Sequence, residues 1–137
     1  MTESLPTFRL LRSIGAVLAG AIVSVTLSLV TDAVLQKVGV LPQLGHPAGS
    51  GPLLVATIYR TVYGVLGAYL TALLAPSRPM LHAMILGFIG FVMSILGAVM
   101  TWSRAAEFGP HWYPVALVVL ALPTARLGGK LRERQLT

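Results

Sequence analysis

Four long apolar segments limit what this chain can fold into. A helix needs about 20 residues to cross the hydrocarbon core of a bilayer, which is roughly 30 Å thick. Lipid offers no partner to backbone N–H and C=O groups, and the segments lack the alternation of barrel strands, so we expect each of them to form a helix. The four segments cover about residues 13–35, 52–75, 80–102 and 112–127. The fourth segment is the shortest.

The composition indicates that lipid, rather than water, surrounds the chain. Hydrophobic residues make up 55% of the 137 residues and charged residues only 10%, whereas soluble domains contain about 25% charged residues. The mean hydropathy is +0.82. We expect a single membrane domain over residues 1–137. The chain has no cysteine, which excludes disulfides and thiolate metal sites.

The connections between the apolar segments contain proline, glycine and polar residues. They read "LPQLGHPAGSGP" (41–52), "APSRP" (75–79) and "SRAAEFGPH" (103–111). The prolines of the second connection are typical of the end of one helix and the start of the next. Because this turn is so short, we expect the helices on either side to be antiparallel neighbours. The sequence therefore predicts an all-α, integral membrane four-helix bundle with antiparallel up-down order.

The basic residues predict the orientation of the bundle. With four spans both termini lie on one side, and the other side holds only Lys37 and Arg104. The positive-inside rule then places the N and C termini in the cytoplasm, with residues 1–12 and 128–137 as tails. The apolar stretch of the first segment is too long for a signal peptide, so we expect an uncleaved helix. The basic residues expected on the side of the termini are Arg9, Arg12, Arg78, Arg126, Lys130, Arg132 and Arg134.

Small and polar residues recur every fourth position in three of the segments. Residues four apart share one face of a helix, and small side chains allow two helix backbones to approach closely in a membrane. We therefore expect these stripes to be packing faces. They comprise Ala16, Gly20, Ser24, Ser28, Asp32 and Gln36 in the first segment, Ala56, Arg60, Gly64, Ala68 and Ala72 in the second, and Gly90, Ser94 and Ala98 in the third.

Two charged residues, Asp32 and Arg60, lie inside apolar segments and on these stripes. An unpaired charge deep in a membrane helix costs at least about 2.5 to 3.5 kcal/mol, so we expect the two to form an ion pair. Tyr59 and Tyr63 are hydroxyl partners close by. Two interpretations remain open: a structural contact that sets the register of two helices, or a polar site open to the outer side.

The sequence shows no constellation of residues typical of catalysis. There is no glycine-rich phosphate loop and no nucleophile elbow. The three histidines, His46, His82 and His111, share no helix face and no spacing typical of metal ligands. We therefore expect no enzyme activity, no cofactor and no metal. The net charge of +6 comes from residues that flank apolar segments, so we expect no nucleic-acid partner.

The stretches "ATIYRTVYGVLGAYLTALLAPSRPMLHAMILG" and "EFGPHWYPVALVVLALPTARLGGKL" resemble a type of small, four-helix bacterial inner-membrane protein to which no activity is assigned. This resemblance implies a multi-pass protein of the bacterial cytoplasmic membrane. We expect a structural or accessory protein whose partners are the bilayer and either a second copy or a neighbouring membrane protein. The alternative is a small transporter or channel subunit that uses Asp32 and Arg60.

Overall fold

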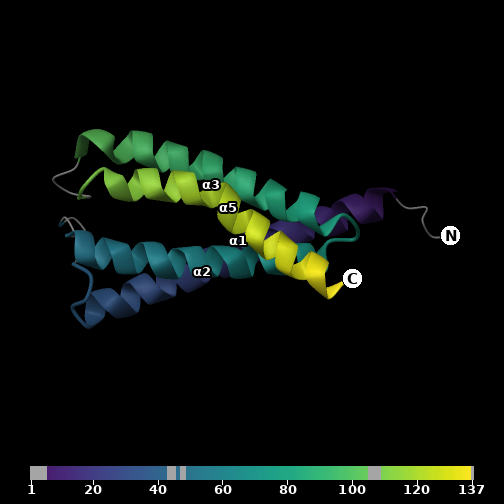
Figure 1. The fold of residues 1–137 in the computed structure, drawn as a ribbon, viewed down its shortest axis with the longest axis horizontal. Coiled ribbons are helices and arrows are strands. Elements are labelled where there is room, and N and C mark those ends of the chain that lie inside the picture. The colour runs from purple at the N-terminus through teal and green to yellow at the C-terminus, as the bar shows by residue number, and fades with distance from the viewer. Residues whose placement is uncertain (1–5, 43–45, 47–48, 105–108, 137) are drawn as a thin grey trace.

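The computed structural model describes residues 6–42, 46, 49–104 and 109–136, and these residues form helices and their connections without any strand (Figure 1). All four long helices are long and apolar enough to cross a membrane. This confirms the prediction of an all-α protein with four helices of membrane-spanning length. The elements are α1 (Pro6–Lys37), α2 (Ser50–Leu74), α3 (Pro79–Thr101), the short 3₁₀ helix η1 (Trp102–Arg104) and α5 (Trp112–Gln135).

The first and last helices extend beyond the expected spans. α1 begins at Pro6, within the expected tail of residues 1–12, of which residues 1–5 lie outside the described part. α5 continues to Gln135, through most of the expected tail of residues 128–137. Pro123 lies inside α5, where it removes one backbone hydrogen bond. The helix bends partway along its length in Figure 1 and then continues.

Contacts between α1 and α2 join residues in opposite order along the two helices. Near the start of α1, the Thr71 hydroxyl donates to the carbonyl oxygen of Ala16 at 2.9 Å. Near the end of α1, Asp32 meets Arg60. We call the two ends of the bundle the Ala16 end and the Asp32 end. Helix α1 begins and α5 ends at the right of Figure 1, which is the Ala16 end.

Glycines allow the helices to approach closely at three crossings. A Cβ atom added to Gly67 would lie 2.7 Å from the carbonyl oxygen of Gly20 and 2.9 Å from the Cβ of Ser24, which brings α1 against α2. At Gly128 of α5 an added Cβ would lie 2.6 Å from the carbonyl oxygen of Val65 in α2. At Gly129 it would lie 3.0 Å from the Cβ of Ala83 in α3. Such contacts are typical of helix packing in membranes.

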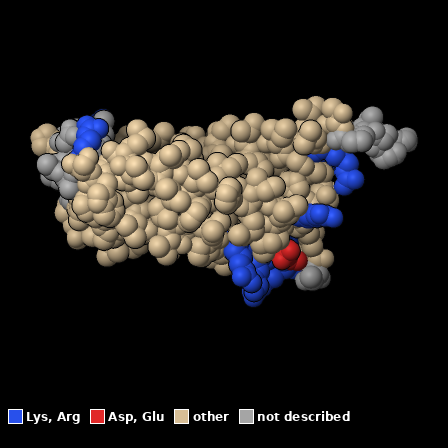
Figure 2. All heavy atoms as spheres, turned by 90° about the horizontal axis from the view of Figure 1, so that it is seen from above, with Lys and Arg blue, Asp and Glu red and all other residues tan. Residues whose placement is uncertain are grey.

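The molecule buries small side chains and exposes large apolar ones. Its core cluster consists of four alanines, Ala68, Ala72, Ala83 and Ala125. Large side chains point outward; Val99, for example, is 70% exposed. Figure 2 shows Lys and Arg at the left end and over the right-hand part of the molecule, with an uncharged stretch between them. This distribution suits a protein surrounded by hydrocarbon along its middle and by water at its ends.

Candidate functional site

The carboxylate of Asp32 receives two donors from consecutive residues of α2. The Nη2 group of Arg60 donates to Oδ2 of Asp32 in an ion pair, and the Tyr59 hydroxyl donates to Oδ1. Both oxygens of the carboxylate therefore have a partner across the α1–α2 contact. The side chain of Asp32 is 19% exposed and that of Arg60 is 31% exposed. The pair is thus largely screened from the surroundings by the protein.

Tyr63 lies one helical turn beyond Tyr59 but binds a different residue. Its hydroxyl is 2.8 Å from Oγ1 of Thr31. The Thr31 hydroxyl already donates to the carbonyl oxygen of Leu27 at 2.8 Å, so in the Thr31–Tyr63 contact the tyrosine is the donor. The structure thus brings Tyr59 and Arg60 onto Asp32 and places Tyr63 beside them on Thr31. The Tyr59 and Tyr63 rings are 5.9 Å apart between centroids.

Tyr113, near the start of α5, lies within electrostatic range of the Asp32–Arg60 pair, which the sequence does not indicate. It is partly buried, and it lies close enough to Arg60 and Asp32 to interact electrostatically with both charges. From sequence alone a tyrosine at the start of a span is typical of the membrane interface. Nothing in the sequence indicates that the start of α5 packs near the Asp32–Arg60 pair.

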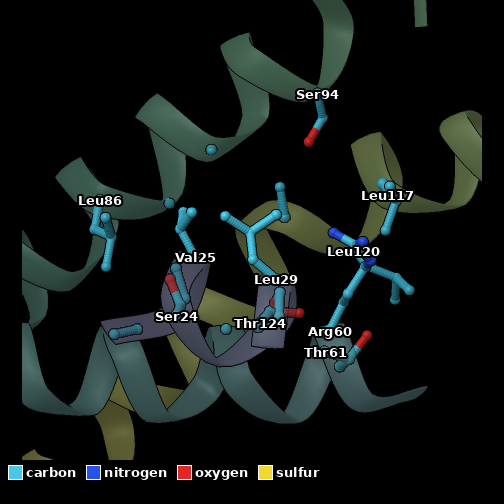
Figure 3. Close-up of a pocket in the computed structure, with 17 residues that line it drawn as sticks. Ser24, Val25, Leu29, Arg60, Thr61, Leu86, Ser94, Leu117, Leu120 and Thr124 are labelled. Carbon is cyan, nitrogen blue, oxygen red and sulfur yellow. The ribbon is translucent and has the colours of Figure 1, made fainter. Parts of the chain in front are cut away.

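A cavity of about 280 Å³ lies beside the ion pair, between all four helices (Figure 3). Among the described residues Arg60 is the one charged residue that lines it, and most of the others are apolar or small. In Figure 3 the Arg60 side chain extends from α2 across this space toward Leu120 of α5. The cavity is lined by Ser24, Val25, Ser28 and Leu29 of α1, Arg60, Thr61, Gly64 and Ala68 of α2, Leu86, Gly87, Gly90 and Ser94 of α3, and Leu117, Leu120, Ala121, Thr124 and Ala125 of α5.

The guanidinium of Arg60 carries a donor without an acceptor. Its Nη2 binds Asp32, but its Nε–H is buried and has no hydrogen-bond partner among the described residues. A buried donor left without a partner costs about 1 to 3 kcal/mol. Buried polar groups in proteins nearly always have a partner. The buried Nε–H is therefore a cost of placing Arg60 at this contact, and it offsets part of the stabilisation from the ion pair with Asp32.

The small-residue stripe of α3 differs from those of α1 and α2. A Cβ atom added to Gly90 or to Gly97 would meet nothing within 4 Å, so the expectation of close helix packing is wrong at this part of α3. Gly90 and Ser94 instead line the cavity. The close packing of α3 lies nearer its start, where His82, Ala83 and Gly87 are buried.

The histidines occupy separate places in the fold. His82 is buried; its Nδ1–H donates to the carbonyl oxygen of Arg78 at 3.0 Å, and its Nε2 is 2.8 Å from the Ser13 hydroxyl of α1. His111 stacks on Trp102 with the ring centroids 3.9 Å apart, and His46 is exposed. Within the described residues no three His, Asp or Glu side chains converge in a way that could hold a metal ion.

Comparison with known proteins identifies no relative: no family model, no curated protein and no solved structure matches the chain. What the chain does must therefore be argued from its own residues.

Proposed function

We propose that this chain is a small structural or accessory protein of the bacterial cytoplasmic membrane, and not an enzyme. Its four helices cross the bilayer in antiparallel up-down order, with the N and C termini in the cytoplasm. The Ala16 end then faces the cytoplasm and the Asp32 end faces outward. Its partners are the bilayer and either a second copy or a neighbouring membrane protein.

The contact of Asp32 with Arg60 and Tyr59 carries the structural part of this proposal. Two side chains of α2, Arg60 and Tyr59, satisfy the carboxylate of Asp32 in α1 at a depth where unpaired charges are costly. Such a contact sets the register of α1 against α2, because a slip of one turn would separate the charges. The orientation is supported by the basic residues near the ends of the helices. By their positions along the helices, Lys37 and Arg104 lie toward the Asp32 end and seven others toward the Ala16 end, namely Arg9, Arg12, Arg78, Arg126, Lys130, Arg132 and Arg134.

A stability measurement tests the structural role. Asp32→Ala and Arg60→Ala should each lower the thermal midpoint in detergent, because each leaves one charge unpaired. The double variant should recover part of the loss. Coupling between contacting residues typically amounts to about 0.5 to 3 kcal/mol. Strictly additive losses would contradict the structural role.

The cavity beside Arg60 favours a second candidate function, a small transporter or channel subunit. An internal space with one charged residue is a feature that a purely structural bundle does not need. Liposomes that contain the purified protein provide the test. This candidate requires flux of a solute or ion that Arg60→Ala abolishes while the thermal midpoint stays near that of the wild type. Absence of flux in the wild type contradicts it.

A further inference from the structure

The basic part of α5 begins well inside the bundle and not at its end. A Cβ atom added to Gly87 of α3 would lie 2.4 Å from the Cβ of Ala125 in α5, so these two residues are level with each other. Gly87 is eight residues beyond Pro79, where α3 begins, which is about 12 Å along the helix. Arg126, the next residue of α5, therefore lies nearly as far inward from the turn that joins α2 and α3.

The opposite end of the bundle gives the same depth. The rings of Trp102 and His111 stack 3.9 Å apart between centroids, which aligns the end of α3 with the start of α5. α3 has 23 residues and no Lys, Arg, Asp or Glu, so its uncharged length of roughly 34 Å can cross a core of about 30 Å. The uncharged part of α5, residues 112–125, is about 21 Å long. Arg126 therefore lies within the thickness that α3 spans.

Arg126 is exposed at this depth, and no acidic residue of the described part of the chain pairs with it. Asp32 lies at the opposite end of the bundle and binds Arg60. Glu133 is seven residues further along α5, about 10 Å toward the end of the bundle. A lipid-facing arginine inside the hydrocarbon is costly unless the bilayer thins around it and polar groups come to it. The position therefore favours an anionic partner from outside the chain.

Two more cations continue from Arg126 to the end of the bundle. Lys130 and Arg134 follow at intervals of four residues, so the three side chains share one face of α5, and all three are exposed. We call them the basic row. Leu127 and Leu131 lie beside the row and are 51% and 42% exposed. Figure 2 shows basic side chains over the right-hand part of the molecule and not only at its tip. This face thus presents cations and apolar surface together.

We propose that the basic row binds the phosphate of an anionic phospholipid, which is drawn inward toward the level of Arg126 while the acyl chains of the lipid lie against Leu127 and Leu131. A guanidinium suits this ligand because it can donate two parallel hydrogen bonds to phosphate oxygens. The row carries three positive charges against the single carboxylate of Glu133 near its end, so a lipid with a net negative charge fits better than a zwitterionic one. A free anion in water does not reach a face that hydrocarbon surrounds. This inference rests on the membrane placement proposed above, and not on the accessory role or on the orientation.

Native mass spectrometry of the protein in mild detergent tests the ligand. The probes are phosphatidylglycerol and phosphatidylcholine with the same acyl chains, which differ in net charge. A neutral detergent micelle has no charged surface, so the general attraction of basic residues to an anionic leaflet is absent. The wild type should bind phosphatidylglycerol at least about fivefold more tightly, as expected for the interaction of a basic residue with anionic lipid. Equal binding of the two lipids to the wild type overturns the proposal.

Arg126→Gln and Arg9→Gln form a matched pair of variants that tests the site. The side chains of Ser13 in α1 and His82 in α3 are 2.8 Å apart, so Arg9, one turn before Ser13, is level with the turn before α3 and lies at the end of the bundle. Both arginines are exposed, and each change removes one positive charge. Arg126→Gln should lose the preference for phosphatidylglycerol and Arg9→Gln should retain it, with both variants folded as judged by circular dichroism. Retention in Arg126→Gln, or equal loss in the two variants, overturns the proposal.

Spin labels on two single cysteines test the depth of the phosphate. Leu127 is two residues after Ala125 and Ile85 is two residues before Gly87, so the two positions are level, and both side chains are exposed. In nanodiscs of phosphatidylglycerol, a label at Leu127→Cys should broaden the phosphorus NMR signal of the lipid more strongly than a label at Ile85→Cys. The reason is that phosphate is drawn inward only beside the basic row. Equal broadening by the two labels overturns the proposal.

Two further outcomes separate this inference from the others. If the wild type is a dimer and Arg126→Gln is a monomer, an acidic residue of a second copy pairs with Arg126 and the lipid assignment is wrong. If the protein stays soluble and monodisperse without detergent, the membrane placement itself fails. Failure of phosphatidylglycerol binding in a protein that needs detergent overturns only the inference about the basic row.

Discussion

Arg60 of α2 donates to the carboxylate of Asp32 in α1 through Nη2, while its Nε–H has no acceptor among the described residues and its side chain lines the cavity between the four helices. One side chain therefore belongs both to a helix–helix contact and to an internal space. Arg60→Ala therefore distinguishes a structural role from a transport role only when the thermal midpoint and the flux are both measured.

The two tyrosines of α2 should differ in their effect on stability. Tyr59→Phe removes a donor to the Asp32 carboxylate, and hydrogen bonds to charged groups contribute about 1.5 to 3 kcal/mol. Tyr63→Phe removes a donor to the neutral Thr31 hydroxyl, where about 0.5 to 1.5 kcal/mol is typical. In chemical denaturation in the same detergent, Tyr59→Phe should have a lower free energy of unfolding than Tyr63→Phe. The reverse order would mean that Tyr59 contributes little to holding Asp32.

A methyl group at Gly67 should destabilise the α1–α2 crossing. It would lie 2.7 Å from the carbonyl oxygen of Gly20, closer than van der Waals contact, so the helices must separate. Gly67→Ala should therefore cost about 1 to 3 kcal/mol, as overpacking does elsewhere. Gly15→Ala is the matched control, since an added Cβ there meets nothing within 4 Å. It should leave the thermal midpoint unchanged or raise it slightly, because alanine favours helix more than glycine does.

The Thr71 hydroxyl should contribute measurably to the same interface. Thr71 is fully buried, and it donates to Ala16 across the helix contact at 2.9 Å. Thr71→Val keeps the shape and removes the donor, at an expected cost of about 0.5 to 1.5 kcal/mol, in the range of hydrogen bonds between membrane helices. Thr101→Val should cost less, because the Thr101 hydroxyl donates within its own helix to Gly97. Equal losses in the denaturation midpoints of the two variants would argue against this role.

The helices could be predicted from the sequence because hydrophobicity and proline position are local properties. The stripes of α1 and α2 also indicate which residues face each other, and Asp32 and Arg60 lie on those stripes. The sequence could not place Tyr113 near this pair, nor could it show that α1 and α3 separate around Gly90. Both features depend on the angles at which helices cross, which a stripe does not encode. The sequence does not show that α5 continues beyond Leu127 to Gln135, because the basic residues of that stretch are typical of a cytoplasmic tail.

The proposed orientation can be tested by labelling single cysteines, because the chain contains none of its own. Ser103, in η1, and Ser77, in the turn between α2 and α3, are both exposed and lie at opposite ends of the bundle. In intact cells a membrane-impermeant maleimide should modify Ser103→Cys and leave Ser77→Cys unmodified until the membrane is permeabilised. This follows if the basic residues retain the Ala16 end in the cytoplasm. Labelling of Ser77→Cys alone would reverse the orientation, and labelling of both in intact cells would indicate insertion in two orientations.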